Sequence, residues 1–112
     1  MRRGRQIAVL DFAGKLAGYA SFGPGRTRGL GEGELYELYL RPEYQGVGLG
    51  RRLFDTVRAD VTRRRMRGLV VWSLADNERA CGFYRALGGT ERARADERMG
   101  GVRLEKAAFI WP

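Results

Sequence analysis

Apolar and polar positions change their spacing several times along this chain of 112 residues. Runs in which apolar side chains recur at every second position, or fill most of the run, are typical of β-strands. We expect strands at residues 6–12, 16–22, 34–40, 69–74, 90–99 and 102–111. A spacing of 3.6 residues, typical of an amphipathic helix, begins near Leu49 and again after Asn77. The predicted order is β-β-β-α-β-α-β-β, which indicates one α+β domain over residues 1–112.

The first predicted helix carries its apolar residues on one stripe, at Leu49, Leu53, Phe54, Val57 and Val61. Arginines gather near its C-terminal end, where positive charge favours the helix dipole, and we expect the helix to end at Gly68. The second predicted helix is capped by Asp76 or Asn77 and extends to about Leu87.

Charge and composition narrow the classes of function. The chain carries 21 Lys and Arg residues against 13 Asp and Glu residues, a net charge of +8. Because the arginines are spread along the chain, we interpret most of them as a solvated surface rather than as a nucleic-acid stripe. The absence of histidine excludes His-based catalytic triads, and with one cysteine we expect no metal site. The single cysteine and the lack of a long apolar run favour a cytoplasmic location.

The stretch Gln45-Gly46-Val47-Gly48-Leu49-Gly50 lies between a predicted strand and a predicted helix. Unpaired backbone N–H groups and the positive end of the helix dipole meet at such a position. Glycines there let the backbone approach a phosphate closely, and Arg51 and Arg52 would add positive charge. The pattern therefore predicts a phosphate site, although a plain glycine-rich turn explains it equally well. The Gly-Lys-Ser/Thr ending of a P-loop is missing, and the spacing and the downstream acidic residue of the dinucleotide fingerprint do not fit either.

A second group of residues lies on the second predicted helix. Asn77 and Tyr84 are seven residues apart, so their side chains lie on nearly the same helix face. We interpret Phe83 and Leu87 as core. Tyr84 fits the core as well, but its hydroxyl is also a weak acid with a pKa of about 10 when unperturbed.

Together, these motifs resemble the GNAT superfamily of acyl-CoA-dependent N-acyltransferases. The glycine stretch matches the family's central motif, and "LADNERACGFYRALG" is similar to its next motif, with the Asn and the Tyr in place. The similarity extends over residues from about 7 to 110. It implies a mixed, mostly antiparallel sheet with two helices, and acetyl-CoA held in a V-shaped opening between strands 34–40 and 69–74.

The resemblance also implies which residues bind acetyl-CoA. In the family, the backbone of the first of these two strands pairs with the pantetheine arm, the glycine loop holds the pyrophosphate, and the Asn contacts the pantetheine. Carried over to this chain, the acetyl-CoA-binding residues are Leu38, Tyr39, Leu40, Gln45, Gly46, Val47, Gly48, Leu49, Gly50, Arg51 and Asn77.

For the chemistry, the resemblance places Tyr84 near the thioester sulfur, where it could protonate the leaving thiolate as general acid. The family's general-base position falls on Glu34 when it is counted back from Gln45, and Glu37 is a second choice. Strict alternation puts Glu34 and Glu37 on opposite faces of the strand. A β-bulge would change this parity, so the sequence leaves the choice open.

The predicted function is therefore an N-acetyltransferase that moves an acetyl group from acetyl-CoA to an amine of a small molecule or a protein. A CoA-binding regulatory module without efficient catalysis is the alternative, and a basic nucleic-acid-binding domain ranks last. The family usually has a strand and two helices before the first hairpin, whereas this chain begins almost at the hairpin. We therefore expect an exposed sheet edge and a homodimer that covers it.

Overall fold

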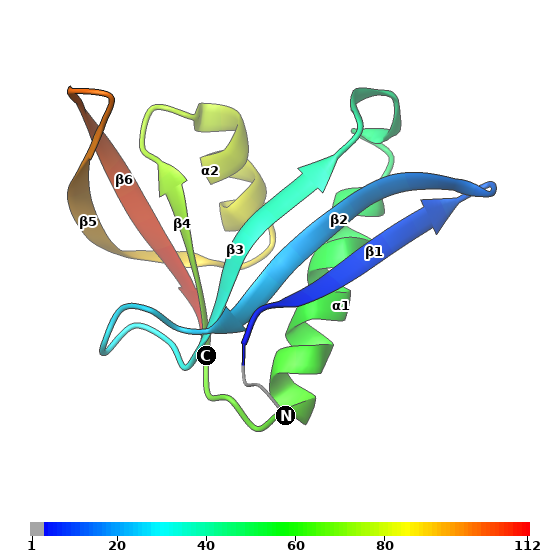
Figure 1. Ribbon diagram of the computed structural model, residues 1–112, viewed down its shortest axis with the longest axis horizontal. Helices are drawn as coiled ribbons and strands as arrows, with labels where there is room; N and C mark the ends of the chain where they lie inside the picture. The colour runs from blue at the N-terminus through cyan, green and yellow to red at the C-terminus, as the bar shows by residue number, and fades with distance from the viewer. Residues whose placement is uncertain (1–3) are drawn as a thin grey trace.

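The computed structural model describes residues 4–112, which form a single sheet and two α-helices (Figure 1). The elements follow the predicted order and are β1 (Gln6–Phe12), β2 (Lys15–Pro24), β3 (Gly33–Leu40), the 3₁₀ turn η1 (Pro42–Tyr44), α1 (Leu49–Arg63), β4 (Leu69–Leu74), α2 (Glu78–Ala86), β5 (Thr90–Met99) and β6 (Val102–Trp111). The α+β prediction is confirmed, and the boundaries of four strands match the predicted ranges to the residue.

The strands of the described region lie in the order β1-β2-β3-β4-β6-β5. Neighbouring strands run antiparallel except β3 and β4, which are parallel. The parallel pair is short, because only Gly33–Leu35 pair with Leu69–Val71. Beyond these residues the two strands diverge and leave a V-shaped opening in the middle of the sheet (Figure 1).

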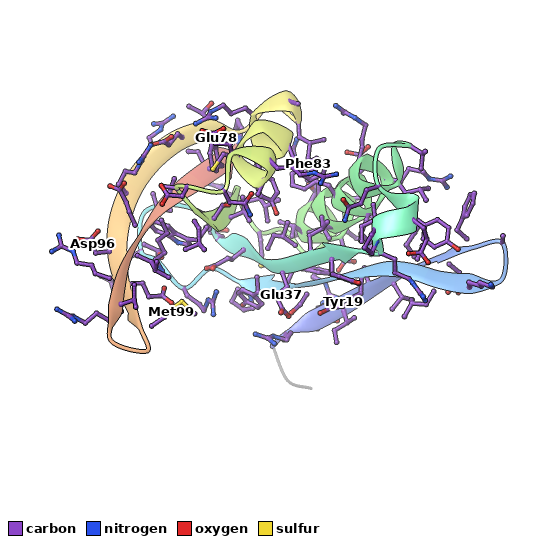
Figure 2. The ribbon with its side chains drawn as sticks, turned by 90° about the horizontal axis from the view of Figure 1, so that it is seen from above. Tyr19, Glu37, Glu78, Phe83, Asp96 and Met99 are labelled. Carbon is purple, nitrogen blue, oxygen red and sulfur yellow. The ribbon has the colours of Figure 1, made fainter. Side chains whose placement is uncertain are left out.

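Both helices cover the same face of the sheet, as Figure 2 shows from above. The apolar stripe of α1 packs against β1, β2 and β3, and Leu53, Phe54 and Val57 are at most 1% exposed. The other face carries Tyr19 and Glu37, which point away from the helices in Figure 2. We call this second side the open face of the sheet.

A β-bulge in β3 decides which residues reach each face. Ser21 of β2 lies opposite Glu37 and Phe22 lies opposite Leu35, so Tyr36 is an extra residue. Leu35 and Leu38 therefore both face the helices and pack in or against the core. Strict alternation, which would put Glu34 and Glu37 on opposite faces, therefore does not hold in β3, and the bulge that the sequence left open is present.

The end of α1 also differs from the prediction. The helix ends at Arg63, and Arg64 is its C-cap. The amides of Arg65 and Met66 donate to the carbonyls of Thr62 and Val61, the hydrogen-bond pattern of a Schellman motif. Arg65 has a φ of 62° and takes the left-handed position that glycine usually occupies. Gly68, the expected stop, lies in the turn that leads into β4.

Candidate active site

A cavity of about 520 Å³ lies between the end of β3, the glycine loop, the start of α1 and one face of α2. Its walls are Leu38, Leu40, Gln45, Gly46, Gly48, Gly50, Arg51, Asn77, Arg79, Ala80, Phe83, Tyr84, Ala86 and Leu87. The two sequence motifs, which are separated by some thirty residues, therefore meet in one site.

The three glycines of the loop serve different purposes. Gly46 and Gly48 have φ values of 81° and 85°, in the left-handed region that favours glycine. Gly50 lies inside the first turn of α1, where a Cβ would come within 3.2 Å of the Phe83 ring. Gly50 therefore permits the close approach of α1 to α2, whereas Gly46 and Gly48 permit the turn itself.

The N-terminus of α1 is open toward the cavity. Its N-cap is Gly48, which has no side chain to accept a hydrogen bond, and no acidic residue lies in the first turn. Within residues 4–112, no acceptor is recorded for the amides of Leu49, Gly50 and Arg51, as expected for the first turn of a helix. Since Arg51 and Arg79 line the same cavity, this end of the site suits a phosphate or pyrophosphate group.

The edge of β3 supplies a second kind of binding group. The Arg41 amide donates to the Ala17 carbonyl of β2 at 2.8 Å, so alternation directs the backbone groups of Leu38 and Leu40 toward the opening beside β4. The Gln45 side chain already donates to the Leu40 carbonyl at 3.0 Å. The Leu38 backbone and the Leu40 amide lie on the side of the strand that β4 leaves, where an extended ligand could pair with them.

Tyr84 lies in the apolar part of the cavity, where Phe54, Phe83, Phe109 and Trp111 surround its ring. The residue is only 8% exposed. Burial, with a smaller contribution from the neighbouring Cys81, raises the pKa of Tyr84 to about 12. The hydroxyl is therefore protonated at neutral pH and is able to donate a proton or a hydrogen bond.

Asn77 is the N-cap of α2, because its side-chain oxygen accepts from the Ala80 amide at 3.0 Å. This contact decides between the two caps that the sequence left open, Asp76 and Asn77. It also orients the Asn77 side chain at the cavity wall, where its NH₂ group remains able to donate.

The two candidate bases lie on the open face, away from this cavity. The bulge at Tyr36 puts Glu34 and Glu37 on the same face of β3. Glu34 is 1% exposed and accepts hydrogen bonds from Arg26, whereas Glu37 is exposed. Glu34 and residues of β4 line a second cavity at the fork of the V.

Three of the residues expected to bind acetyl-CoA are not among the side chains of the first cavity. Tyr39 lies on the open face against Tyr19, with ring centroids 5.7 Å apart. Val47 is 67% exposed, and Leu49 is buried. Their expected contacts were backbone contacts, and these stay predictions.

A family model of the acetyltransferase (GNAT) family matches residues 2–88. The N-acetyltransferase YuaI of Bacillus subtilis is 34% identical over 103 residues, which cover 91% of this chain and 59% of that protein. The crystal structure of a GNAT-family acetyltransferase from Desulfovibrio desulfuricans superposes with a TM-score of 0.81 at 26% identity and covers 96% of this chain and 68% of that one. A streptothricin acetyltransferase of Bacillus anthracis, solved with acetyl coenzyme A, shares the fold with a TM-score of 0.86 at 14% identity over 98% of this chain and 63% of that one.

This chain belongs to the GNAT acetyltransferase family. The resemblance that the sequence motifs suggested is thereby confirmed, as is the mixed, mostly antiparallel sheet. This chain spans 59% of the length of YuaI. No helix in residues 4–112 is long and apolar enough to cross a membrane.

The GNAT site also contains residues that the sequence interpretation missed. Phe83 and Leu87, assigned to the core, line the cavity as well, and Arg79 adds a second cation to its wall. The spacing of Ala80, Phe83, Tyr84 and Leu87 marks one helix face, and this signal could have revealed the wall. Arg26, the partner of Glu34, could not be found in this way because it lies in the loop between β2 and β3.

Proposed function

We propose that this GNAT domain transfers the acetyl group of acetyl-CoA directly to a primary amine. The observation that carries the proposal is one cavity that combines an uncapped helix N-terminus, an open strand edge and the hydroxyl of Tyr84. The pyrophosphate would bind at Gly46–Arg51, the pantetheine would pair with Leu38 and Leu40 and meet Asn77, and the thioester would lie near Tyr84.

Glu34 is the general base that we favour. Its buried carboxylate lies beside the point where β3 and β4 begin to diverge. Glu37 lies on the same face but is exposed, so a proton acceptor there would act in bulk water. The acceptor amine would approach from the open face, opposite acetyl-CoA.

The proposed reaction needs no covalent enzyme intermediate. The ammonium form of the acceptor gives one proton to Glu34, and its nitrogen then attacks the carbonyl carbon of the thioester. The C–N bond forms, the C–S bond breaks, and the thiolate takes a proton from Tyr84. The nitrogen of the new amide still carries one proton too many and gives it to the tyrosinate. Glu34 releases to water the proton that it took from the ammonium. A backbone N–H of β3 could stabilise the oxyanion.

The pKa of Tyr84 limits how this step can proceed. A thiol has a pKa of about 8.5, well below the value of about 12 for Tyr84, so proton transfer to the thiolate alone is unfavourable. Loss of the proton from the N-protonated amide, a strong acid, offsets this cost when the two transfers are coupled. Tyr84 therefore acts as a relay rather than as a free acid.

A thiol-release assay with acetyl-CoA and a panel of amines, amino acids and peptide N-termini tests the proposal. Tyr84→Phe keeps the ring and deletes the hydroxyl, so turnover should fall by about 10²–10⁴ while CoA affinity changes little. Full turnover in this variant would remove Tyr84 from the chemistry.

A CoA-binding module without efficient catalysis is the second candidate. The contact between Arg26 and Glu34 favours it, because both oxygens of the carboxylate already accept hydrogen bonds. Binding of CoA without thiol release for any amine in the panel would support this alternative.

A further inference from the structure

The second cavity, of about 490 Å³, lies on the open face, where β3 and β4 begin to diverge. Its lining residues come from the β2–β3 loop, β3, β4 and the β5–β6 hairpin: Arg26, Thr27, Glu34, Trp72, Ser73, Leu74, Glu97 and Lys106. This is the side from which an acceptor would reach the thioester, so its chemistry bears on what the acceptor is.

One wall of this cavity is an ion pair between a buried carboxylate and an exposed cation. The Arg26 guanidinium donates to Glu34 from Nη2 at 2.7 Å and from Nε at 3.3 Å. The Glu34 side chain is 2% exposed, whereas the Arg26 side chain is 62% exposed. The guanidinium, which also lies 4.3 Å from the centre of the Tyr36 ring, can therefore be rehydrated when it leaves, whereas Glu34 stays buried.

The backbone holds Glu34 independently of this guanidinium. The Arg26 amide donates to the other carboxylate oxygen at 2.9 Å. If the Arg26 side chain swings away, the amide keeps the carboxylate in its place. The departure would, however, leave a buried negative charge without a cation, which is costly. Another cation can replace the guanidinium without that cost.

The opposite wall is also suited to a cation with an apolar body. Glu97 accepts from Lys106 at 2.9 Å, and the Lys106 ammonium lies 4.8 Å from the centre of the Trp72 ring. The hydrogen bond from Lys106 is the main cause of the lowered pKa of Glu97, and the charge of Arg26 contributes as well. Arg26 therefore lies in the field of two carboxylates, and the same cavity contains an indole that already contacts one cation.

We propose that the Arg26 guanidinium is a placeholder for the acceptor, and that the acceptor is a cationic primary amine whose ammonium displaces it from Glu34. This inference rests on the proposed function, because only an acetyl transfer would use the bound amine. The ammonium takes the place of the guanidinium beside Glu34, and the apolar part of the acceptor lies against Trp72. The acetylated product is a neutral amide and no longer competes for the carboxylate, so Arg26 returns and helps to expel it.

Binding of a simple cation tests the placeholder without any activity measurement. Methylammonium chloride is titrated into the full chain and into Arg26→Ala, with sodium chloride at equal ionic strength as the reference, and the thermal midpoint is followed. We expect methylammonium to stabilise Arg26→Ala clearly more than the wild type. Arg28→Ala removes the same charge from the same loop and should behave like the wild type. Adding Glu34→Gln to Arg26→Ala should abolish the gain.

Steady-state kinetics provide a second test of the placeholder. If Arg26 occupies Glu34 in about nine molecules in ten, removing it should lower the KM for a cationic amine about tenfold. Arg26→Gln, which keeps the length and one donor without the charge, replaces Arg26→Ala if the latter folds poorly. Equal responses of the Arg26 and Arg28 variants to methylammonium would overturn the inference. Cation binding without turnover for any amine would instead leave the placeholder intact and overturn the proposed function.

Discussion

Tyr84 is the residue whose protonation differs most clearly between the folded and unfolded chain. Its pKa is raised from about 10 to about 12 by burial, so the folded state holds this proton more tightly. The free energy of unfolding is therefore unaffected by this group below pH 10, and it falls as the pH rises from 10 to 12. At pH 11 the loss is about 1.4 kcal/mol.

We therefore expect urea unfolding at pH 9 and pH 11 to show a larger loss of unfolding free energy in the wild type than in Tyr84→Phe. Tyr44→Phe removes another tyrosine outside the site and serves as the control, because it should lose as much as the wild type. An identical pH dependence in Tyr84→Phe and the wild type would show that the pKa of Tyr84 is not raised in the folded chain.

The glycines allow a second test at the scale of one residue. Gly48 has a φ of 85° and no atom within 4 Å of where a Cβ would lie. Gly48→Ala should cost about 1 kcal/mol of folding free energy, from backbone strain alone. Because the added methyl group points into open space at the proposed pyrophosphate site, the loss of CoA affinity should be larger.

Gly14→Ala is the matched control for this variant. Gly14 has a φ of 79°, also with nothing within 4 Å, but it lies in the β1–β2 turn, outside the cavity. Both variants should lose similar stability in urea, and only Gly48→Ala should lose CoA affinity by calorimetry. Equal CoA affinities would favour the plain glycine-rich turn.

At the scale of the element, the end of α1 shows what a sequence pattern conceals. Glycine is the usual residue at a left-handed C-cap position, so Gly68 was the natural choice for the helix end. The chain instead places Arg65 there, with a φ of 62°. A left-handed conformation costs a non-glycine residue roughly 1–2 kcal/mol.

Arg65→Gly should therefore stabilise the fold by about 0.5–1 kcal/mol. The variant removes the backbone strain, and the greater freedom of glycine in the unfolded chain offsets part of this gain. Arg65→Ala removes the same side chain but keeps the Cβ, so it should bring no comparable gain. Urea unfolding of both variants measures the difference. The same gain from alanine would assign the effect to charge in the arginine cluster instead.

Strand β3 marks the other limit of a sequence interpretation. The sequence of Gly33–Leu40 clearly predicts a strand, but nothing in it indicates a β-bulge at Tyr36. The bulge reverses the parity of every later residue in the strand. It brings Glu34 and Glu37 to one face. The two candidate bases therefore differ in burial and not in the direction of their side chains.

At the scale of the whole molecule, the element order was predictable because each change of hydrophobic period is abrupt. The cavity beside α2 was predictable too, since its glycine motif and its Asn–Tyr motif are each local in sequence. The second cavity was not. Its residues Arg26, Glu34, Trp72, Glu97 and Lys106 come from four separate segments, and no local pattern relates them.

The open face also bears on assembly. β1 forms an edge of the sheet, and its residues Ile7 and Val9 are 65% and 62% exposed. Exposed apolar residues on an edge strand invite pairing with another strand. We expect a homodimer through this region, with a sedimentation mass twice the chain's 12.6 kDa and Ile7→Lys shifting it toward the monomer. A monomer at high micromolar concentration would contradict this expectation.

Binding of CoA should also raise the free energy of unfolding of the whole chain. A ligand that binds only the folded state adds about 2.7 kcal/mol at 100 times its dissociation constant, so CoA should raise the melting temperature. The glycine loop and the free amides of α1 predict that most of this gain comes from the pyrophosphate. Pantetheine, which lacks the pyrophosphate together with the adenosine 3′-phosphate, should therefore give a much smaller shift at equal concentration, whereas dephospho-CoA, which keeps the pyrophosphate, should retain most of it. Equal shifts for CoA and pantetheine would place the binding energy on β3 rather than on α1, and no shift at millimolar CoA would remove the basis for an acetyl-CoA site in this cavity.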